Sequence, residues 1–399
     1  MDRHAGGGRN HDPARRGARS GAPRRRSGRA GLDGGGAVCA ARAGARAGGG
    51  TGGAARRGGA MSRTIGSILP EGLTIPAGAV ELEITGLALD SRKVKPGALF
   101  AALPGVKTDG RRFIAMAVEK GAVAVLAPRG TTAPVPVIEA DDAPGALAAL
   151  AARFYPRQPE TIAAVTGTNG KSSTVEFLRQ IWAASGHEAA CLGTLGVTRA
   201  SGRTEVGYTT PDAIALHRSL DALAAEGVTH LAMEASSHGL KQRRMDGVRV
   251  TAAAFTNLTQ DHLDYHPDFD DYFASKMRLF TALSETGAPA VVWMDNDWSG
   301  KVADACRAAG LEVIEAGWRG RDLTVTEILP HAARQDVSFT WRGEERRVDL
   351  PLIGEFQTSN ALVAAALAIA TGIDADAAFA ALGRLTGVAG RLQQVGETA

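Results

Sequence analysis

The sequence predicts an α/β protein, in which a small mixed α/β N-terminal domain precedes a domain with a mainly parallel sheet and a small antiparallel sheet. Three observations lead to this fold class. Apolar strand patterns alternate with helical patterns from residue 160 onwards, as in βαβ units. A glycine-rich turn at residues 166–173 joins a strand to a helix. The helical period is lost between Leu323 and Leu350, where three short strand patterns follow one another.

Residues 1–60 are rich in Gly, Ala and Arg, and we expect this extension to be disordered. They hold 13 Arg, no Lys and three Asp, a net charge of +10, whereas the remaining 32 basic and 39 acidic residues give −7. Almost no large apolar side chain is present to offset the entropy lost on ordering. A nucleic-acid-binding tail and a targeting peptide are alternatives. The abrupt change in composition after residue 60 favours Met61 as the true first residue.

The composition also predicts a cytoplasmic protein, with no nucleic acid and no membrane among its partners. No uncharged apolar run reaches the length of about 18 residues that a membrane-spanning helix needs. Cys39, Cys191 and Cys306 fit neither a zinc nor a disulfide spacing, which suits a reducing compartment. The mildly acidic body lacks the basic excess of a nucleic-acid-binding domain. We expect a monomer.

Residues 61–157 predict the small N-terminal domain. Its strand patterns cover residues 81–87, 98–103, 123–126 and 135–137. Its helical patterns cover residues 112–120, which Gly121 ends, and residues 144–154. The prolines between residues 156 and 159 indicate a linker.

Residues 158–399 predict the central domain. Its parallel strands are expected at residues 161–166, 230–235, 252–256, 290–294 and 312–315. Its helices are expected at residues 171–184, 213–226, 272–283, 302–309 and 358–370. The short antiparallel strands are expected at residues 324–328, 337–341 and 346–350.

The strongest chemical signal is the sequence TGTNGKSS at residues 166–173. Glycines let the backbone turn its N–H groups inward, and the N-terminus of the following helix adds positive potential, so such a loop binds phosphate. The spacing departs from the common GxxxxGK[ST] pattern, yet the strand–loop–helix context predicts a P-loop-type site for a nucleoside triphosphate. Lys171 is expected to reach the β- and γ-phosphates, and the Ser172 hydroxyl to bind Mg²⁺.

Two further predicted strands end in polar residues that suit a metal ion. Residues 230–233 run into Glu234, and residues 252–255 run into TNLTQDHLDYH at residues 256–266. Sites in open parallel sheets lie beyond the carboxyl ends of the strands, where a carboxylate is a natural Mg²⁺ ligand. We predict Glu234 as a ligand and His262 as a further one. Taken singly, His238 and His266 are better explained by structural hydrogen bonds.

The sequence resembles the Mur ligases from about Met61 to its end. The motifs TGTNGKSS, YTTPD, MEASSHGL, NLTQDHLDYH, LIGEFQTSN and GVAGR stand in the order and approximate spacing of that family. MEASSHGL and NLTQDHLDYH resemble most specifically the members that extend UDP-N-acetylmuramoyl-L-alanyl-D-glutamate. The segment LDSRKVKPGALFAALPGVKTDGRRFI resembles the family's uridine-nucleotide-binding domain. The resemblance implies ATP and Mg²⁺ as cofactors.

The resemblance also assigns roles to residues where the motifs match. The UDP-sugar is expected to contact Leu89, Ser91, Val106, Lys107 and Thr108. The muramoyl-dipeptide is expected to contact Thr209, Thr210, Ser236, Gln242 and Arg244. ATP is expected to contact Gly167, Thr168, Asn169, Gly170, Lys171, Ser172, Ser173, Asn257, Asn360 and Arg391. The metal is expected to contact Ser172, Glu234, His262 and Lys276, and catalysis is expected to use Lys171, His262 and Lys276.

Lys276 has a further implied property. It lies on residues 271–278, which match the helix that carries a carboxylated lysine in this family. The resemblance therefore implies that Lys276 is N6-carboxylysine, in which CO₂ has converted the amine into an anionic metal ligand. Without the resemblance, a solvated helix lysine is the better interpretation.

The implied reaction is ATP-dependent ligation of meso-2,6-diaminopimelate to UDP-N-acetylmuramoyl-L-alanyl-D-glutamate through an acyl phosphate, in peptidoglycan biosynthesis. L-lysine in place of diaminopimelate remains open. A D-alanyl-D-alanine-adding ligase and a folylpolyglutamate synthase are alternatives of the same fold, which NLTQDHLDYH and the DSR-containing N-terminal segment disfavour. A nucleic-acid-associated ATPase that uses the basic extension is an alternative of another class.

Several positions depart from the family pattern. Ser172 and Ser173 stand where a Thr pair is usual, Gln357 where many members have Asn, and Gln393 where an acid often follows the GR motif. The family's third domain, with its DNPR-type amino-acid-binding motif, has no counterpart before Ala399. We therefore expect the 399-residue chain to bind the UDP-sugar without completing ligation.

Overall fold

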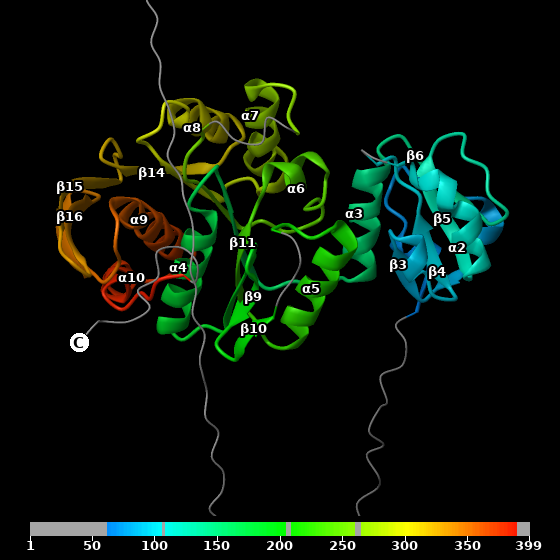
Figure 1. The fold of residues 1–399 in the computed structure, drawn as a ribbon, viewed down its shortest axis with the longest axis horizontal. Coiled ribbons are helices and arrows are strands. Elements are labelled where there is room, and N and C mark those ends of the chain that lie inside the picture. Colours follow the sequence, from blue (N-terminus) through cyan, green and yellow to red (C-terminus); the bar gives the residue numbers. More distant parts are fainter. Residues whose placement is uncertain (1–61, 106–107, 205–208, 260–264, 389–399) are drawn as a thin grey trace, which may run out of the picture. The chain divides into compact units, whose positions relative to one another are not determined.

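The structure, a computed structural model of the 399-residue chain, describes residues 62–105, 108–204, 209–259 and 265–388 (Figure 1). Every element below lies in one compact unit, which spans residues 58–399. The expectations for residues 1–60, and for Val106, Lys107, His262 and Arg391, fall outside the described residues. Within the described chain, no helix is long and apolar enough to cross a membrane.

The N-terminal region is built on a parallel sheet of four strands in the order β3-β4-β5-β6. An apolar cluster lies on each face of this sheet, one packed against α3 (Ala143–Phe154) and the other against α2 (Ile114–Glu119). The strands are β3 (Gly86–Ala88), β4 (Ala98–Ala101), β5 (Ala122–Pro128) and β6 (Val137–Ala140). The four strands and two helices give this region the α/β character that the sequence predicts.

The strand expected at residues 81–87 is two strands with different partners. β2 (Glu83–Ile84) pairs antiparallel with β1 (Arg63–Thr64), just before the short helix α1 (Ile65–Ile68), whereas β3 joins the four-stranded sheet. Thr85 lies between them and donates hydrogen bonds to the carbonyl oxygens of Pro96 and Gly97. These tertiary bonds end one pairing and begin the next, which apolar patterning along the chain does not reveal.

The central region is one sheet of eleven strands in the order β10-β9-β8-β11-β7-β12-β13-β14-β15-β16-β17. Neighbours from β8 to β15 are parallel, and the strands at both ends are antiparallel. The predicted fold class is therefore confirmed, with the antiparallel strands continuing the parallel sheet. The bounds are β7 (Thr161–Thr166), β8 (Ala189–Gly193), β9 (Gly196–Arg199), β10 (Gly202–Thr204), β11 (His230–Glu234), β12 (Ala252–Phe255), β13 (Pro289–Trp293), β14 (Glu312–Gly317), β15 (Leu323–Pro330), β16 (Gln335–Trp341) and β17 (Glu344–Leu350).

Helices cover both faces of the central sheet, as expected for βαβ units. One apolar cluster joins the sheet to α4 (Lys171–Ala184), α9 (Glu355–Ala370) and α10 (Ala375–Leu382). The other joins it to α5 (Ala213–Ala225), α6 (Ser237–Lys241), α7 (Phe269–Arg278) and α8 (Ser299–Ala308). The helix expected at residues 272–283 begins earlier, because Asp268 caps α7, and it ends in a π-helical turn at Leu279–Leu283.

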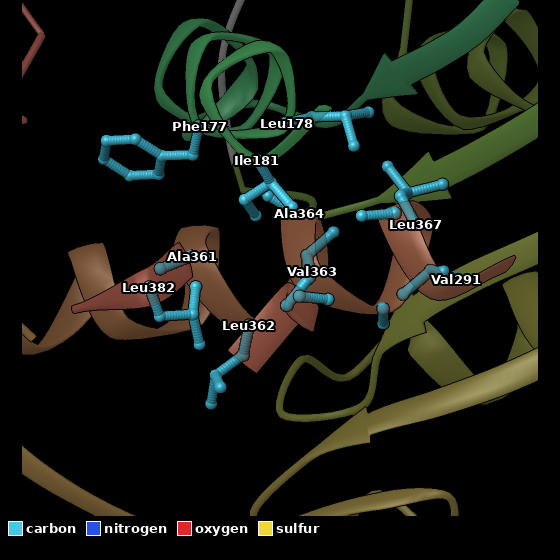
Figure 2. Close-up of a cluster of buried hydrophobic side chains, with 14 of the residues drawn as sticks. Phe177, Leu178, Ile181, Val291, Ala361, Leu362, Val363, Ala364, Leu367 and Leu382 are labelled. Atoms are coloured by element: carbon cyan, nitrogen blue, oxygen red, sulfur yellow. The ribbon is translucent and has the colours of Figure 1, made fainter. Parts of the chain in front are cut away.

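α4 begins within residues 166–173, the phosphate loop, and packing against α9 fixes the position of this helix. Figure 2 shows Leu178 and Ile181 of α4 facing Ala364 and Leu367 of α9. α9 is buried around most of its circumference, so it lacks the polar face of a surface helix. Ala364 is small enough to let the two helices approach closely. The N-terminus of α4 is thereby held at the edge of the sheet.

Candidate functional site

The candidate site lies at the carboxyl edge of the central sheet, where β7, β11 and β12 end side by side. β7 lies between the other two strands, although β11 and β12 follow it by more than sixty residues in the chain. Because the three strands are parallel, the loops that leave their carboxyl ends meet at one place. Residues 167–170 and Asn257 belong to these loops, and Glu234 is the last residue of β11.

The phosphate loop has the backbone that its glycines allow. β7 ends at Thr166 and α4 begins at Lys171, as predicted. Gly167 has a φ of +147° and Gly170 a φ of +87°. A Cβ atom at Gly167 would lie 2.0 Å from Thr256 Oγ1, and one at Gly170 would lie 2.2 Å from Asn360 Oδ1. Both positions therefore require glycine for conformation and for space.

Two lysine side chains converge on this loop. Lys171 Nζ donates hydrogen bonds to the carbonyl oxygens of Gly167 at 2.9 Å and Thr168 at 2.8 Å. Lys276 Nζ, from α7, donates to the same Gly167 oxygen at 2.8 Å and lies 4.4 Å from the centroid of the Tyr272 ring. Lys276 is only 1% exposed. Two amines beside a helix N-terminus make this loop a place for an anion such as phosphate.

Glu234 joins the phosphate loop to the next strand of the sheet. Its carboxylate, 1% exposed, accepts hydrogen bonds from Ser172 Oγ at 2.8 Å and from the Thr194 backbone nitrogen at 2.8 Å. A Cβ atom on Gly193 would lie 2.0 Å from Glu234 Oε1, so glycine leaves the space that this carboxylate fills. A hydroxyl beside a carboxylate is a donor set that fits Mg²⁺ together with phosphate oxygens and water.

Ser172 and Glu234 are two described residues that would hold such an ion. In the described part of the chain, no group of three or more His, Cys, Asp or Glu side chains forms another candidate metal site. His262, the histidine predicted for the metal, lies outside that part.

Asn257 and Asn360 support the loop from two sides. Asn257 Oδ1 accepts a hydrogen bond from the Asn169 backbone nitrogen at 2.9 Å, and its amide nitrogen donates to the Asn169 carbonyl at 3.3 Å. Asn360, on α9, donates from Nδ2 to Gln357 Oε1 at 3.1 Å and is 5% exposed. Ser173 is buried at the first turn of α4. The residues predicted for ATP within the described chain therefore form one group.

The residues predicted for the muramoyl-dipeptide form a neighbouring group. Thr210 Oγ1 and Ser236 Oγ share a hydrogen bond of 2.9 Å, and Arg244 donates to the Thr210 carbonyl at 2.7 Å. Arg244 also donates to Gln242 Oε1, at 2.6 Å from its terminal nitrogen. Thr210 further donates to the carbonyl oxygen of Glu234 at 3.2 Å. The two predicted groups thus meet at Glu234.

Thr194 is a residue of this site that the sequence did not reveal. It follows β8, a strand that was not predicted because its short apolar run lies in a segment rich in Gly and Thr. Its hydroxyl donates to Glu234 Oε2 at 3.3 Å and shares a hydrogen bond of 2.9 Å with Thr209 Oγ1. Its position directly beyond a buried strand was the signal that would have found it.

A hollow of about 190 Å³ opens beside Ser172 and Glu234 and is also lined by Glu176, Cys191 and Arg203. Burial raises the pKa of the Cys191 thiol well above its usual range, and the adjacent Glu176 adds to this effect. The thiol therefore stays protonated and is not a nucleophile at neutral pH.

His266 has a structural environment, as its sequence context indicated. Its Nδ1 lies 2.6 Å from Asp271 Oδ2 and its Nε2 lies 3.1 Å from Ser237 Oγ, so both ring nitrogens have partners. Hydrogen bonds from Lys241 and then from His266 lower the pKa of the Asp271 carboxyl. His238 stacks on Tyr265 with ring centroids 3.9 Å apart.

The residues predicted for the UDP-sugar belong to the N-terminal sheet. Leu89 and Ser91 follow the carboxyl end of β3, and Thr108 follows β4. Leu89 is 37% exposed, which is unusual for a large apolar side chain, whereas Ser91 is buried and donates to the sulfur of Met116. These residues also lie at the carboxyl edge of a parallel sheet, where ligands of such sheets bind.

Comparison with known proteins identifies two family regions. Residues 165–368 match the Mur ligase middle domain, and residues 83–155 match the Mur ligase family catalytic domain. The chain is 52% identical over 318 residues to the UDP-N-acetylmuramoyl-L-alanyl-D-glutamate–2,6-diaminopimelate ligase of Agrobacterium fabrum, covering 79% of this chain and 65% of that protein. It is 51% identical over 337 residues to the ligase of the same name from Rhizobium meliloti, covering 84% and 69%.

A solved structure agrees with these matches. It is the structure of a UDP-N-acetylmuramoyl-L-alanyl-D-glutamate–2,6-diaminopimelate ligase, with a TM-score of 0.77 and 27% sequence identity, and the match covers 85% of this chain and 70% of that one. The chain therefore spans about two thirds of the length of the proteins that it matches.

Proposed function

This chain belongs to the Mur ligase family, and on that premise we propose that it is an ATP-dependent, amide-forming ligase that joins meso-2,6-diaminopimelate to UDP-N-acetylmuramoyl-L-alanyl-D-glutamate in peptidoglycan biosynthesis. The observation that carries the proposal is the position of Glu234. Its carboxylate is bonded to Ser172 of the phosphate loop and to Thr194, which reaches Thr209. One buried carboxylate therefore lies between the residues proposed for ATP and those proposed for the acyl substrate.

The proposed reaction has two steps. The γ-carboxylate of the D-glutamyl residue attacks the γ-phosphorus of ATP, an O–P bond forms, and the bond to the β–γ bridging oxygen breaks to release ADP. The amine of the amino acid then attacks the acyl carbon, the C–O bond to phosphate breaks, and the nitrogen loses a proton. Phosphoryl transfer of this kind depends mainly on charge neutralisation and in-line placement.

The residues of this chain would divide those tasks. Lys171 and the N–H groups of residues 167–173 would neutralise and hold the phosphates, and Asn257, Asn360 and Arg391 would position the nucleotide. Ser172, Glu234, His262 and Lys276 would hold Mg²⁺, which supplies further charge neutralisation when bound. Lys276 would do so as a carbamate. Thr209, Thr210, Ser236, Gln242 and Arg244 would hold the muramoyl-dipeptide, while Leu89, Ser91, Val106, Lys107 and Thr108 would hold the UDP end.

L-lysine is the second candidate for the incoming amine. The names of the relatives given above favour diaminopimelate, because both are diaminopimelate ligases at 51–52% identity. Diaminopimelate has a second carboxylate that lysine lacks, so a cationic group at that carboxylate would discriminate between them.

The first half-reaction gives the sharpest test, because it needs only ATP and the acyl substrate. The chain is incubated with Mg·ATP, UDP-N-acetylmuramoyl-L-alanyl-D-glutamate and hydroxylamine, which traps an acyl phosphate as a hydroxamate that mass spectrometry detects. We expect the hydroxamate together with ADP, and neither when the glutamyl residue is replaced by its amide. ADP formation that is independent of the acyl substrate would contradict the proposal. Replacing hydroxylamine by diaminopimelate or L-lysine then tests whether this chain completes ligation and, if it does, which of the two amines it uses.

A further inference from the structure

Helix α6 is followed by an arginine, Arg243, in a backbone conformation that arginine does not favour. Arg243 has a φ of +60°. Its backbone nitrogen donates to the Leu240 carbonyl at 3.2 Å, and the Arg244 nitrogen donates to the Gly239 carbonyl at 2.9 Å. These two bonds form a Schellman cap, in which the left-handed residue is usually glycine. An arginine there carries a conformational cost that its side chain must offset.

A second described residue other than glycine has a positive φ, and it has a local explanation. Arg342 has a φ of +51° and precedes Gly343, in the tight turn between β16 and β17. Two-residue hairpin turns of this kind require positive φ at both positions. Arg243 has no hairpin around it; its positive φ belongs to the Schellman cap of α6, and its side-chain contacts offset the cost of placing an arginine there.

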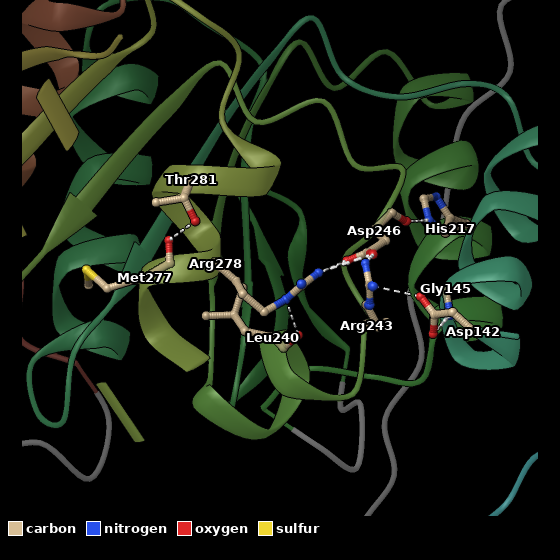
Figure 3. A network of polar contacts seen from close by, with 9 residues as sticks. All are labelled: Asp142, Gly145, His217, Leu240, Arg243, Asp246, Met277, Arg278 and Thr281. Carbon is tan, nitrogen blue, oxygen red and sulfur yellow. Dashed lines mark hydrogen bonds and ion pairs between the residues drawn. The ribbon is translucent and has the colours of Figure 1, made fainter. Parts of the chain in front are cut away.

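Those contacts connect two regions of the chain. Arg243 donates from one terminal nitrogen to Asp142 Oδ2 at 2.7 Å, and from the other to Asp246 Oδ2 at 2.9 Å (Figure 3). Asp142 is the N-cap of α3, where its Oδ1 accepts a hydrogen bond from the Gly145 nitrogen at 3.2 Å. Asp246 also accepts from Arg278 of α7 at 3.0 Å. The ion pairs therefore run from the N-terminal region to the helix that carries Lys276.

The Asp142–Arg243 pair joins the two regions that carry the residues proposed for the substrate. Asp142 follows β6, and Leu89 and Ser91 follow β3, so all three lie at the carboxyl edge of the same sheet, on its two outer strands. Arg243 stands between Gln242 and Arg244, which bind Tyr265 and Thr210. A ligand with a UDP group at one end and a dipeptide at the other must contact both sets at once. Once one end of the ligand is bound, the other end binds more readily only if the UDP-binding and dipeptide-binding residues are held at a separation that matches the ligand.

We infer that Arg243 is a positioning residue, which holds the UDP-sugar residues of the N-terminal region and the dipeptide residues of the central region in register for one bipartite ligand. The inference rests on the proposed function, because that function supplies a ligand with these two ends. Arg243 touches no residue of the phosphate loop in the described contacts, so it acts through Gln242, Arg244 and Asp142.

The test compares two ligands by calorimetry, UDP and UDP-N-acetylmuramoyl-L-alanyl-D-glutamate. Asp142→Asn removes the charge but keeps an oxygen for the helix cap, and Arg243→Asn removes the guanidinium with a residue that tolerates positive φ. The pair is partly exposed, so we expect each variant to weaken binding of the full ligand about two- to fivefold. Binding of UDP should stay unchanged. The double variant should lose no more affinity for the full ligand than the single variant that binds this ligand more weakly.

Two neighbouring positions give matched controls. Asp141→Asn removes an adjacent carboxylate, which pairs with Arg129 inside the N-terminal region. Arg342→Asn changes the other arginine of positive φ. Both controls should bind UDP and the full ligand as the wild type does. High salt should shrink the difference between wild type and the Asp142 and Arg243 variants, since screening weakens exposed ion pairs.

Three outcomes would overturn the inference. Unchanged binding of the full ligand in both variants would show that the pair positions nothing. Equal weakening for UDP and for the full ligand would show structural damage rather than lost register. If the wild type bound the full ligand no more tightly than UDP, the proposed function itself would fail, and this result is recognised before any variant is made.

Discussion

The two edges of the central sheet use buried polar side chains differently. At the carboxyl edge, polar side chains from separate elements hydrogen-bond to one another, as Ser172 of α4 and Glu234 of β11 do at 2.8 Å. At the amino edge, His230 opens β11 and packs against aromatic rings, with its centroid 5.0 Å from Trp182 and 4.0 Å from His187. Polar side chains at the carboxyl edge therefore surround the phosphate loop, whereas the His230 ring at the amino edge packs against other aromatic rings.

The buried histidine at the amino edge is uncharged, whereas the carboxyl edge leaves space beside its polar atoms. Burial, and then the neighbouring His187, lower the pKa of His230 to about 4, so this ring is neutral at physiological pH. Around the phosphate loop, Gly167, Gly170 and Gly193 leave space beside polar atoms that any larger residue would fill. The comparison teaches that substitutions at the carboxyl edge should change ligand binding, whereas substitutions at the amino edge should change stability.

The largest expected effect is at the phosphate loop. Lys171→Ala should weaken binding of Mg²⁺ with a non-hydrolysable ATP analogue by about 100-fold, because charge-assisted hydrogen bonds to phosphate are lost. Ser172→Ala should weaken it by about tenfold. Calorimetry measures both affinities, and thermal melting should show that the fold survives. Lys301→Ala, which removes an amine placed over the Trp298 ring, is the control. Unchanged affinity in both loop variants would contradict the expectation that substitutions at the carboxyl edge change ligand binding.

A second test concerns Lys276, the buried amine on α7. If Lys276 carries a carbamate, ¹³C-labelled bicarbonate should give a carbamate NMR signal in the wild type that Lys276→Met lacks. Hydroxamate formation should fall by at least about tenfold in that variant, since an anionic ligand is removed. Lys171 still donates to the Gly167 carbonyl after the substitution, so the loop should keep its fold. Full activity of Lys276→Met would show that the reaction does not use a carbamate at this position.

Gly193→Ala should have an effect of intermediate size. The added Cβ would lie 2.0 Å from Glu234 Oε1, so the carboxylate must move away from Ser172. We expect the Mg²⁺-dependent part of ATP-analogue affinity to fall by about tenfold, with the affinity in the absence of Mg²⁺ unchanged. Gly300→Ala adds a methyl group in open space and is the control. If Gly193→Ala retains the wild-type response to Mg²⁺, Glu234 is not a metal ligand.

The smallest expected effect is at the amino edge and depends on pH. The pKa of His230 is about 4 in the folded chain and 6.5 as its ordinary value. Between these values the unfolded chain binds more protons, so the free energy of unfolding decreases as pH falls from 6.5 towards 4. Allowing for solvent near the ring, we expect a loss of about 1–2 kcal/mol.

The same experiment separates this effect from other titrations. His230→Asn should flatten the decrease relative to the wild type when unfolding by urea is followed at several pH values. ATP-analogue affinity at neutral pH should match that of the wild type. Identical pH slopes in the two proteins would show that His230 does not contribute, and a loss of affinity would remove the distinction between the two edges.

Much of the fold followed from local patterns along the chain. β7 and α4 occur with the predicted bounds, because a β-branched apolar strand, two glycines and a helix with an apolar face stand in direct succession. α6 escaped prediction because Ser237–Lys241 is too short to display a helical period and has Gly239 at its centre. β8 escaped because its apolar run is short and lies in a segment rich in Gly and Thr, and β9 and β10 escaped because they contain almost no large apolar residues.

The candidate site divides in the same way. The conformation of the phosphate loop was predictable, because it depends on residues that are consecutive in the chain. Glu234 was predictable as a polar residue beyond a strand, but its bonds with Ser172 and Thr194 were not. They exist because β11 lies between β8 and β7, an order that does not follow the sequence.

The sequence by itself determined the phosphate loop, the α/β class and the family, since each depends on local patterns and motif order. Only the tertiary structure decided which distant side chains meet. The ion pair of Asp142 with Arg243 is the clearest example, because neither residue stands in a motif that marks the other. Such contacts depend on how strands are ordered and how helices pack, and packing is a property of the whole fold rather than of any one segment.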